Sequence, residues 1–420
     1  MTDTAPALAP PPPELDRQLA ALTPCEIVVG LPTYNNAATV PVIVAAVRAG
    51  LAAHFTGASA ALVNVDAGST DRTPELLAEA GMPCVLARHE APSVERAAVP
   101  FHGVPGRDAA LRSLFDVARR LQARVLVLLE ADVTSVTEEW IERLVRAVWE
   151  AKADLVTPAY VRHRYEGTIT NLLLAPLVRT LFGRRLRQPF GGTFAVSARL
   201  LSHALGHPVR PTTGRDLMDL WLTGTAIAEG FAVWEAWLGP RHVESRTRTT
   251  DLPTMLAQAL GAVFAVMEQD EELWLGVAGS EPVSAVGDHA PPFATPATVS
   301  VDRMLGAFRR GLRDLIEIWE LVLAPETLDG VLDLDARDVL AYRFPDRLWA
   351  QVVFDFALGH RYGVVHREHL LRSLVPLYLG RTAAFVAATQ ASDGAETEAV
   401  LERVGAAFEA EKPYLTERWR

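Results

Sequence analysis

The first half of the chain alternates between short apolar runs and segments with helical apolar spacing. EIVVGLPTYNN, from Glu26, is an apolar run that ends in turn residues, and TVPVIVAAVRAGLAAHF then has helical spacing. The order recurs as ALVNVDAGSTD and RTPELLAEAG, the short run PCVLAR, the helical DAALRSLFDVARRL and the run RVLVLLEAD. This alternation predicts an α/β fold with a mostly parallel sheet covered on both faces. Such sheets bind ligands at the carboxyl ends of their strands.

The pattern after about residue 250 is helical. Helices are predicted from Trp349 to Leu358 and from His369 to Val386, and the apolar stretch Leu252–Met267 predicts a buried helix. A further helix face is formed by Leu305, Phe308, Leu312, Leu315, Ile316 and Trp319. We therefore expect a disordered Pro/Ala-rich tail at residues 1–22, an α/β domain at 23–250 and a helical domain at 251–420. The Gly- and Pro-rich loop 279–296 is read as a mobile or interaction segment.

Composition and charge favour a globular protein with a small ligand. The 420 residues are 50% hydrophobic and 22% charged, and the net charge is 40 − 51 = −11. That charge argues against a broad surface for nucleic acid or anionic lipid. Cys25 and Cys84 read as reduced core residues. Because no signal peptide or membrane helix is recognised, we expect a cytoplasmic protein without a membrane partner.

Polar residues follow three of the predicted strands. The first strand ends in Pro32-Thr33-Tyr34-Asn35-Asn36, the second in Asp66-Ala67-Gly68-Ser69-Thr70-Asp71, and the third in Glu130-Ala131-Asp132. Carboxylates at the tip of a buried strand leave the core and meet a cation. Simpler roles are a helix cap for Asp71 and organisation of the Gly68–Thr70 turn for Asp66.

These three strand ends together resemble the GT-A glycosyltransferases, which have P-T-Y-N, D-x-G-S-T-D and a metal-binding D-x-D in the same order. Glu130 departs from this pattern because it replaces the first aspartate of D-x-D. The resemblance implies a GT-A, Rossmann-like nucleotide-sugar domain followed by a helical C-terminal region. It also implies that Asp132 holds the metal, with Glu130 facing the metal or the ribose.

Further segments resemble two GT-A enzyme families, mannosylglycerate synthase and glucosyl-3-phosphoglycerate synthase. EADVTSVTEEW resembles D-A-D-x-T-S-x-x-x-x-W of the first, and EGTITNL with APL resembles the acceptor segment G-G-R-V-T-E-L with R-P-L-L of the second. QPFGG resembles a Q-P-L-G-G loop of both, and PGRDAAL resembles a P-G-K-G-type segment with Arg107 in place of lysine. Pro240-Arg241-His242 is placed like a late histidine metal ligand.

The resemblance and the residue chemistry together give a set of expected site residues. A retaining transferase needs cations at the leaving diphosphate and glycines that let the backbone approach the sugar. The expected donor-binding residues are Pro32, Thr33, Asn35, Asp66, Gly68, Ser69, Arg107, Glu130, Ala131 and Gln188. The expected metal ligands are Asp132 and His242, the catalytic positions are Asp219, Gly191 and Gly192, and the acceptor residues are Arg162, Arg164, Thr168 and Thr170. The alternatives are a solvated basic loop for Arg162 and Arg164 and an ordinary surface position for His242.

These residues predict a metal-dependent retaining glycosyltransferase. The resemblance implies Mg²⁺ or Mn²⁺, a GDP- or UDP-hexose donor carrying glucose or mannose, D-glycerate or 3-phosphoglycerate as acceptor, and a homodimer or higher homo-oligomer. One alternative is an inverting GT-A enzyme acting on a polysaccharide or lipid, with Asp219 as general base. The other is a nucleotide-sugar-binding protein without turnover, suggested by Glu130 and Arg107 at positions where the resembled motifs have other residues.

Overall fold

The chain divides into two compact units. The computed structural model describes residues 13–89, 103–207, 218–244, 252–295, 299–335 and 342–419. Unit 1 comprises Met1–Tyr160, Phe190–Thr249 and Val283–Asp288, and unit 2 comprises Val161–Pro189, Thr250–Pro282 and His289–Arg420. We expected a single boundary near residue 250. The division differs because Val161–Pro189 packs with the C-terminal helices and a short segment after Pro282 returns to unit 1.

Unit 1 is built on an eight-stranded sheet in the order β10-β8-β5-β7-β4-β1-β2-β3. The pairs β1–β2, β1–β4, β2–β3 and β8–β10 are parallel, and β7 is antiparallel to β4 and β5. The strands are β1 (Ile27–Thr33), β2 (Ala60–Asp66), β3 (Cys84–Arg88), β4 (Val125–Leu128), β5 (Leu155–Val161), β7 (Phe194–Ser197), β8 (Val233–Pro240) and β10 (Ser284–Val286). The helices are α1 (Pro13–Leu22), α2 (Val40–His54), α3 (Thr73–Ala78), α5 (Arg107–Arg120), α6 (Glu138–Trp149), α8 (Ala198–Gly206) and α9 (Met218–Ala228).

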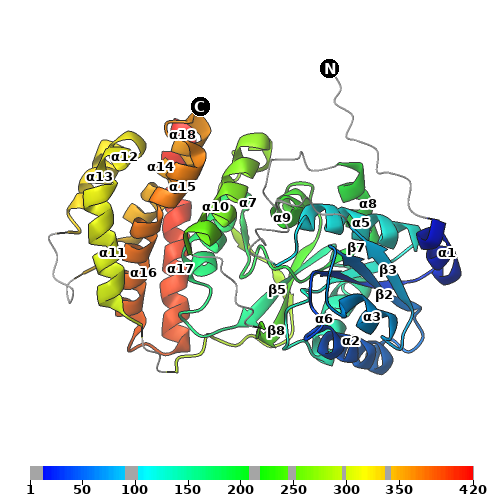
Figure 1. Ribbon diagram of the computed structural model, residues 1–420. Coiled ribbons are helices and arrows are strands. Elements are labelled where there is room, and N and C mark those ends of the chain that lie inside the picture. Colours follow the sequence, from blue (N-terminus) through cyan, green and yellow to red (C-terminus); the bar gives the residue numbers. More distant parts are fainter. Residues whose placement is uncertain are drawn as a thin grey trace, which may run out of the picture. The chain divides into compact units, whose positions relative to one another are not determined.

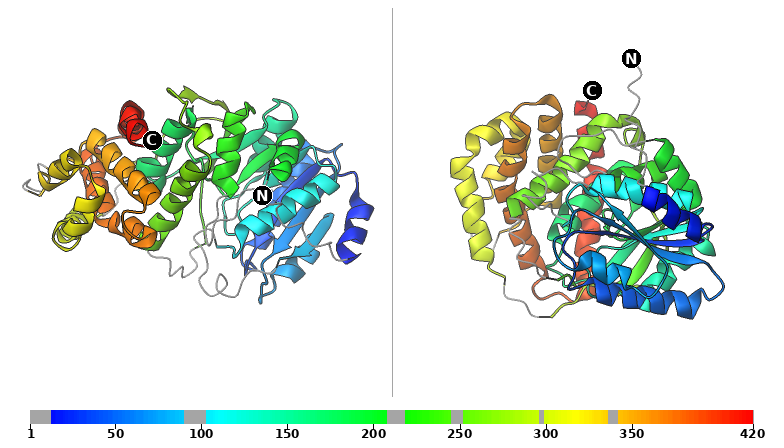
Figure 2. Two further views of the ribbon diagram at one scale, coloured as in Figure 1. Left: turned by 90° about the horizontal axis from the view of Figure 1, so that it is seen from above. Right: turned by 45° about the vertical axis from the view of Figure 1, so that its right-hand side comes forward.

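The sheet is covered on both faces, as predicted. Helices α2, α3 and α6 lie on one face, and α5 and α8 lie on the other (Figure 1; Figure 2 shows the sheet from two further directions). Every residue of β1 is buried, which agrees with a continuous apolar run in a central parallel strand. The predicted mostly parallel sheet with helices on both faces is therefore confirmed, and the polar ends of β1 and β2 lie side by side because Thr33 pairs with Asp66.

Two segments of unit 1 are more ordered than the sequence indicated. We expected no structure before residue 23, yet Pro13–Leu22 forms helix α1; the rest of the expected tail lies outside the described residues. Leu19 is buried, and Gln18 accepts a hydrogen bond from the backbone of Leu86 in β3. Within the loop 279–296, Ser284–Val286 adds the edge strand β10 to the sheet. Pairing with a partner distant in sequence gives both segments their order.

Unit 2 is mainly helical. The η1 segment (Thr170–Leu174) is a π-helix, η2 (Glu271–Leu273) is a 3₁₀ helix, and the short strands β6 (Arg184–Arg185) and β9 (Glu281–Pro282) pair in parallel. The α-helices are α7 (Ala175–Phe182), α10 (Leu252–Gln269), α11 (Val301–Asp314), α12 (Ile316–Val322), α13 (Pro325–Leu332), α14 (Asp346–Tyr362), α15 (Arg367–Ser373), α16 (Val375–Thr389), α17 (Gly394–Ala410) and α18 (Lys412–Arg418). In Figure 1, α11, α16 and α17 run side by side.

The predicted helix His369–Val386 is interrupted. It is divided into α15 and α16 at Leu374, and Pro376 lies in the first turn of α16. Proline is accepted there but not inside a helix, because it has no N–H and its ring clashes with the preceding turn. The stretch Arg367–Thr389 is long and apolar enough to cross a membrane by composition alone, but 72% of its most apolar window is buried inside the protein. That burial is the pattern of a core helix.

A buried carboxylate connects three elements of unit 2. Asp355 on α14 is 2% exposed, accepts a hydrogen bond from the Tyr414 hydroxyl (2.6 Å) and accepts another from the backbone N–H of Ala324 (2.9 Å). Burial raises the pKa of Asp355, although these hydrogen bonds oppose the shift. Burial therefore makes the charged form of this carboxylate less favourable than it is in water.

We predict that Asp355→Ala destabilises the protein while Asp355→Asn largely preserves it. Alanine leaves the Ala324 N–H and the Tyr414 hydroxyl without their acceptor, which costs about 1–3 kcal/mol for each buried group. Asparagine keeps an acceptor oxygen for the Ala324 N–H, and its amide nitrogen can donate to the Tyr414 hydroxyl, which also accepts. Urea unfolding of both variants measures the difference, and equal destabilisation by the two substitutions would contradict the assigned role.

Candidate active site

The ends of β1 and β2 form one hydrogen-bonded turn around Asp66. The Thr33 hydroxyl donates to Oδ1 of Asp66 (2.9 Å), and the backbone N–H groups of Gly68 and Ser69 donate to Oδ2 (3.0 and 2.8 Å). The Ser69 hydroxyl also donates to Oδ1 (2.5 Å). These four donors match the acceptor capacity of a carboxylate. The alternative in which Asp66 organises its own turn is therefore visible in the structure, and its contact with a nucleotide stays a prediction.

Asn35 and Asn36 connect this turn to its neighbours. Asn35 has a left-handed backbone (φ 56°), its N–H donates to the Ser69 hydroxyl, and its side-chain oxygen accepts from the N–H of Thr70. The Asn36 amide donates to the carbonyl of Ala131 (3.0 Å). Asp71 accepts from the backbone of Ala37 and of Thr73, the first residue of α3. The three predicted strand ends therefore meet at the carboxyl edge of the sheet.

Glu130 is paired with an arginine. Its Oε2 lies 2.8 Å from Nη2 of Arg241, and the two side chains are 12% and 19% exposed. Burial lowers the pKa of Arg241, but the attraction of Glu130 outweighs this and the pKa is raised overall. The Arg241 guanidinium also lies 5.6 Å from the centre of the Tyr160 ring. The longer side chain at position 130 is thus directed to a cation that the protein itself supplies.

Gly192 lies against the same carboxylate. A Cβ atom at this position would be 2.5 Å from Cγ, Cδ and Oε1 of Glu130, and a Cβ at Gly191 would be 2.2 Å from Pro158. Both contacts are too short for any side chain. The two glycines predicted from the Gln188–Gly192 motif are therefore required by close packing within unit 1.

Arg107 contacts both Gly192 and Asp219. Arg107, the first residue of α5, is 2% exposed, and its Nη2 donates to the Gly192 carbonyl (3.4 Å). The same Nη2 lies 2.8 and 3.2 Å from the two carboxylate oxygens of Asp219 in the first turn of α9. Four expected site residues are thus linked in series, from Asp219 through Arg107 and Gly192 to Glu130.

Asp132 and His242 lie on adjacent extended segments. Val133 and Val243 form an isolated antiparallel bridge, the Asp132 carbonyl accepts from Glu244, and the His242 carbonyl accepts from Thr134. Asp132 is 6% exposed, whereas His242 is exposed. In the part of the chain that the structure describes, no three His, Cys, Asp or Glu side chains form a ready-made metal cage. The backbone therefore brings together the two segments that carry the expected metal ligands.

The expected acceptor residues belong to unit 2, as does the buried Gln188. Arg162 lies against Gly167, whose Cβ would be 2.8 Å from the arginine Nη1. Thr168 shares a hydrogen bond of 2.5 Å with the Tyr378 hydroxyl, and Thr170 begins the π-helix η1. Tyr378 belongs to α16, far along the chain, so the sequence offered no sign of this contact.

Arg164 has a structural role in unit 2, and its expected acceptor contact stays a prediction. Its guanidinium is buried and donates to the carbonyls of Thr389 (2.7 Å), Gln390 (3.2 Å), Ser392 and Ala294. These carbonyls include the end of α16, where a helix leaves acceptors unsatisfied and favours a cation. Both terminal nitrogens are therefore committed to the backbone of unit 2.

Arg241 is the site residue that the sequence analysis did not select. Its signal was indirect: a glutamate at the tip of a buried strand needs a counter-charge, and Arg241 stands next to a residue already under consideration. The pairing joins residues 111 positions apart, so only the folded chain identifies it.

We predict that Gly192→Ala destabilises unit 1 through Glu130. The added Cβ displaces a carboxylate held by Arg241, at a cost of about 1–3 kcal/mol for overpacking. Gly206→Ala is the control, because a Cβ there meets nothing within 4 Å. In a double-mutant cycle read by urea unfolding, Glu130→Ala should relieve most of the Gly192→Ala cost. Strict additivity of the two substitutions would contradict the contact.

Comparison with known proteins shows which family and which solved structures this chain resembles. Residues 28–203 match the family model described as glycosyl transferase family 2. No curated protein sequence matches the chain significantly. Among solved structures, glucosyl-3-phosphoglycerate synthase from Mycobacterium tuberculosis matches in several complexes. One, with Mn²⁺, UDP-glucose and phosphoglyceric acid, has 22% identity and a TM-score of 0.44 and covers 67% of this chain and 95% of that chain. Another, with Mg²⁺ and UDP, has 22% identity and a TM-score of 0.43 and covers 63% and 84%.

The matched segment runs from β1 through α8 and includes the turn around Asp66 and the pair formed by Glu130 and Gly192. Residues 28–203, most of which lie in unit 1, therefore match glycosyl transferase family 2, and this match indicates that the protein is a glycosyltransferase.

Proposed function

We propose that the enzyme transfers glucose or mannose from a UDP- or GDP-hexose to D-glycerate or 3-phosphoglycerate and retains the anomeric configuration. The observation that carries the proposal is the cluster of Arg107, Glu130, Gly192 and Asp219 at the carboxyl ends of the strands. A buried guanidinium and two close-packed glycines at this edge support donor binding there, because sheets of this kind bind ligands at the carboxyl ends of their strands. The acceptor class rests on the resemblance of the Glu166–Leu172 segment, with Arg162 and Thr170 as the proposed contacts.

The proposed donor site follows from these contacts. Breaking a sugar–diphosphate bond leaves negative charge on the departing phosphate, and Arg107 supplies a fixed positive group there. Asp219 holds the Arg107 guanidinium through both carboxylate oxygens and so orients it. Asp66 acts on the nucleotide through the turn that it builds, and Pro32 and Thr33 border that turn at the end of β1.

The role of Asp219 separates the retaining hypothesis from the inverting one. An inverting enzyme needs a carboxylate that removes a proton from the acceptor hydroxyl. Asp219 already accepts hydrogen bonds from Arg107 on both oxygens, which favours a positioning role. We therefore favour a front-face reaction in which the leaving phosphate assists deprotonation of the acceptor.

Asp132 and His242 fit the metal that the GT-A fold implies. Carboxylate oxygen and imidazole nitrogen suit Mn²⁺, and Mg²⁺ is usually bound through one or two carboxylates together with substrate phosphates. Two protein ligands thus agree with the absence of a three-residue cage among the described residues. Glu130 is not included, because its carboxylate is paired with Arg241. When bound, the metal neutralises charge on the leaving diphosphate.

The remaining parts of the proposal concern the protein's surroundings. Both cysteines of the chain are free, which is usual in a reducing compartment and supports a cytoplasmic location. A homodimer or higher homo-oligomer is proposed from the family resemblance alone.

We predict that Asp132→Asn abolishes Mn²⁺ binding in the presence of UDP, while Glu130→Gln retains it. Asp132 would lose a charged ligand oxygen, whereas Glu130 has its charge committed to Arg241. Electron paramagnetic resonance of Mn²⁺ measures binding without turnover, and circular dichroism checks the fold of both variants. Loss of Mn²⁺ in Glu130→Gln together with retention in Asp132→Asn would reverse our assignment.

We also predict an α-linked product from an α-linked donor. UDP-glucose, GDP-glucose, UDP-mannose and GDP-mannose are each incubated with glycerate and with 3-phosphoglycerate in Mn²⁺. The anomeric proton is then observed by NMR immediately after reaction. A β-linked product would establish inversion, and transfer to neither acceptor would refute the proposed acceptor class.

A further inference from the structure

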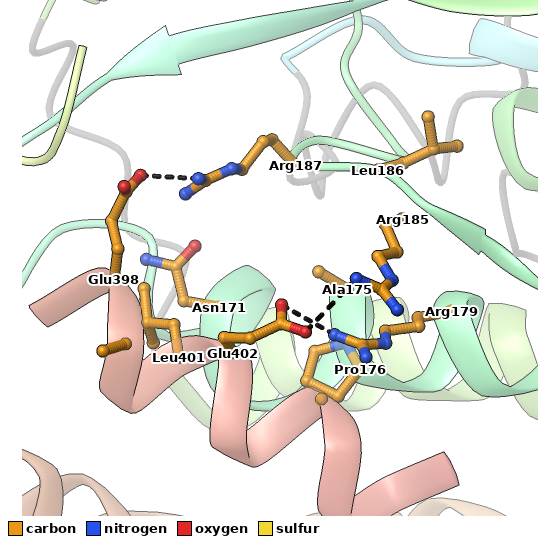
Figure 3. Close-up of a pocket in the computed structure, with 12 residues that line it drawn as sticks. Asn171, Ala175, Pro176, Arg179, Arg185, Leu186, Arg187, Glu398, Leu401 and Glu402 are labelled. Atoms are coloured by element: carbon orange, nitrogen blue, oxygen red, sulfur yellow. Dashed lines mark hydrogen bonds and ion pairs between the residues drawn. The ribbon is translucent and has the colours of Figure 1, made fainter. Parts of the chain in front are cut away.

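Unit 2 contains a pocket of about 380 Å³ between α7, the segment that follows it and α17 (Figure 3). Ala175, Pro176, Leu186 and Leu401 give it an apolar wall. Its charged lining consists of Arg179, Arg185, Arg187, Glu398 and Glu402. Three arginines and two glutamates line the pocket, and a third glutamate, Glu409, lies 2.6 Å from Nη2 of Arg179. None of the donor or acceptor roles described above uses this pocket.

Arg179 is a buried and fixed cation in the pocket wall. Its side chain is 8% exposed, its Nη1 lies 2.8 Å from Glu402, and its Nε donates to Glu409 (2.8 Å) and to the Ser280 hydroxyl (3.1 Å). Gly405 makes room for it, because a Cβ there would be 2.8 Å from Nη1. A guanidinium held in this way loses little entropy when it binds an anion.

Arg185 retains unused donors at the same end of the pocket. Its Nε donates to Ser280 (3.1 Å), but its Nη1 is 3.6 Å from Glu402, beyond hydrogen-bond distance. Within the described ranges, its two terminal nitrogens donate no hydrogen bond. Glu402, the carboxylate facing both arginines, is 56% exposed. An exposed carboxylate in this position is easily displaced, because its ion pairs compete with solvent.

The opposite end of the pocket is closed by a second pair. Arg187 lies 2.5 Å from Glu398, and His289 lies 3.0 Å from the same carboxylate oxygen. Figure 3 shows this pair across the pocket from Arg179, Arg185 and Glu402, with Asn171 beside Glu398. Charged groups therefore stand at both ends of an apolar wall, an arrangement suited to a small organic anion.

We propose that this pocket binds a small oxyanion, the phosphate or carboxylate group of a low-molecular-weight ligand. Arg179 and Arg185 bind its oxygens, and Glu402 occupies Nη1 of Arg179 until the ligand displaces it. Two sources share this chemistry: an effector such as free phosphate, or the hydroxy-acid acceptor. The second source rests on the proposed function, since Asn171 directly follows Thr170 in the chain.

Isothermal titration of the full chain with inorganic phosphate tests the site without turnover. Arg185→Gln should weaken binding about tenfold, because it removes a charge-assisted contact. Glu402→Gln should strengthen binding, because it removes the internal competitor. Arg184→Gln is the matched control: Arg184 precedes Arg185, pairs with Glu281 at 3.0 Å and does not line the pocket. Circular dichroism establishes that all three variants are folded.

Opposite changes in Arg185→Gln and Glu402→Gln, with Arg184→Gln unchanged, support the site. Phosphate affinity that is the same in all four proteins, or undetectable in all four, overturns it. Competition assigns the source: a site for the acceptor makes phosphate a competitive inhibitor against the acceptor, and a separate effector site makes it non-competitive. This assay does not depend on the identity of the product, so failure of the proposed acceptor leaves the titration result valid.

Discussion

The candidate site at the carboxyl edge of the sheet in unit 1 depends on how buried carboxylates are neutralised. Glu130 stands at the tip of a central strand, where an unpaired negative charge would be costly, and Arg241 supplies the compensating cation at 2.8 Å. This pairing fixes the glutamate side chain against Gly192, which in turn has no room for a side chain. The ion pair between Glu130 and Arg241 therefore fixes the backbone of the Gly191–Gly192 segment, although neither glycine takes part in it.

The acidic residues at this edge of the sheet have different hydrogen-bond and ion-pair partners. They therefore differ in their capacity to bind a ligand. Asp66 accepts hydrogen bonds from its own turn and from Thr33, and Asp219 is bound by Arg107. Glu130 is bound by Arg241, and Asp132 lies on the extended segment that pairs with the segment of His242. These four acidic side chains thus have different roles. Asp66 stabilises a turn, Asp219 orients a cation, Glu130 packs against a glycine loop, and Asp132 is the proposed metal ligand. The neighbouring hydrogen-bond donors determine these roles, because an oxygen that already accepts a hydrogen bond has less capacity to bind a ligand.

Unit 2 uses arginines in two ways. Arg164 is buried and donates hydrogen bonds to carbonyls at the end of α16, which fixes the chain there. Arg185, in contrast, has terminal donors that make no hydrogen bond among the described residues, and it lies beside an exposed glutamate. Both side chains belong to a part of the sequence rich in arginine, and composition does not distinguish them. Burial does, since a guanidinium without water must find acceptors within the protein.

The sequence by itself determined the alternation of strands and helices, the parallel sheet and the polar strand ends. These features depend on the spacing of apolar residues and on turn residues, which are properties of neighbouring positions in the chain. Local rules also placed Pro376 at a helix start, although the pattern of apolar residues suggested continuity. Tertiary structure decided the rest. It ordered Pro13–Leu22 and Ser284–Val286 by pairing them with distant strands. It joined Glu130 to Arg241, Arg107 to Asp219 and Arg164 to the end of α16. Those partners lie 111, 112 and at least 225 residues apart, and a charge selects its partner only after folding has removed water and set the distances.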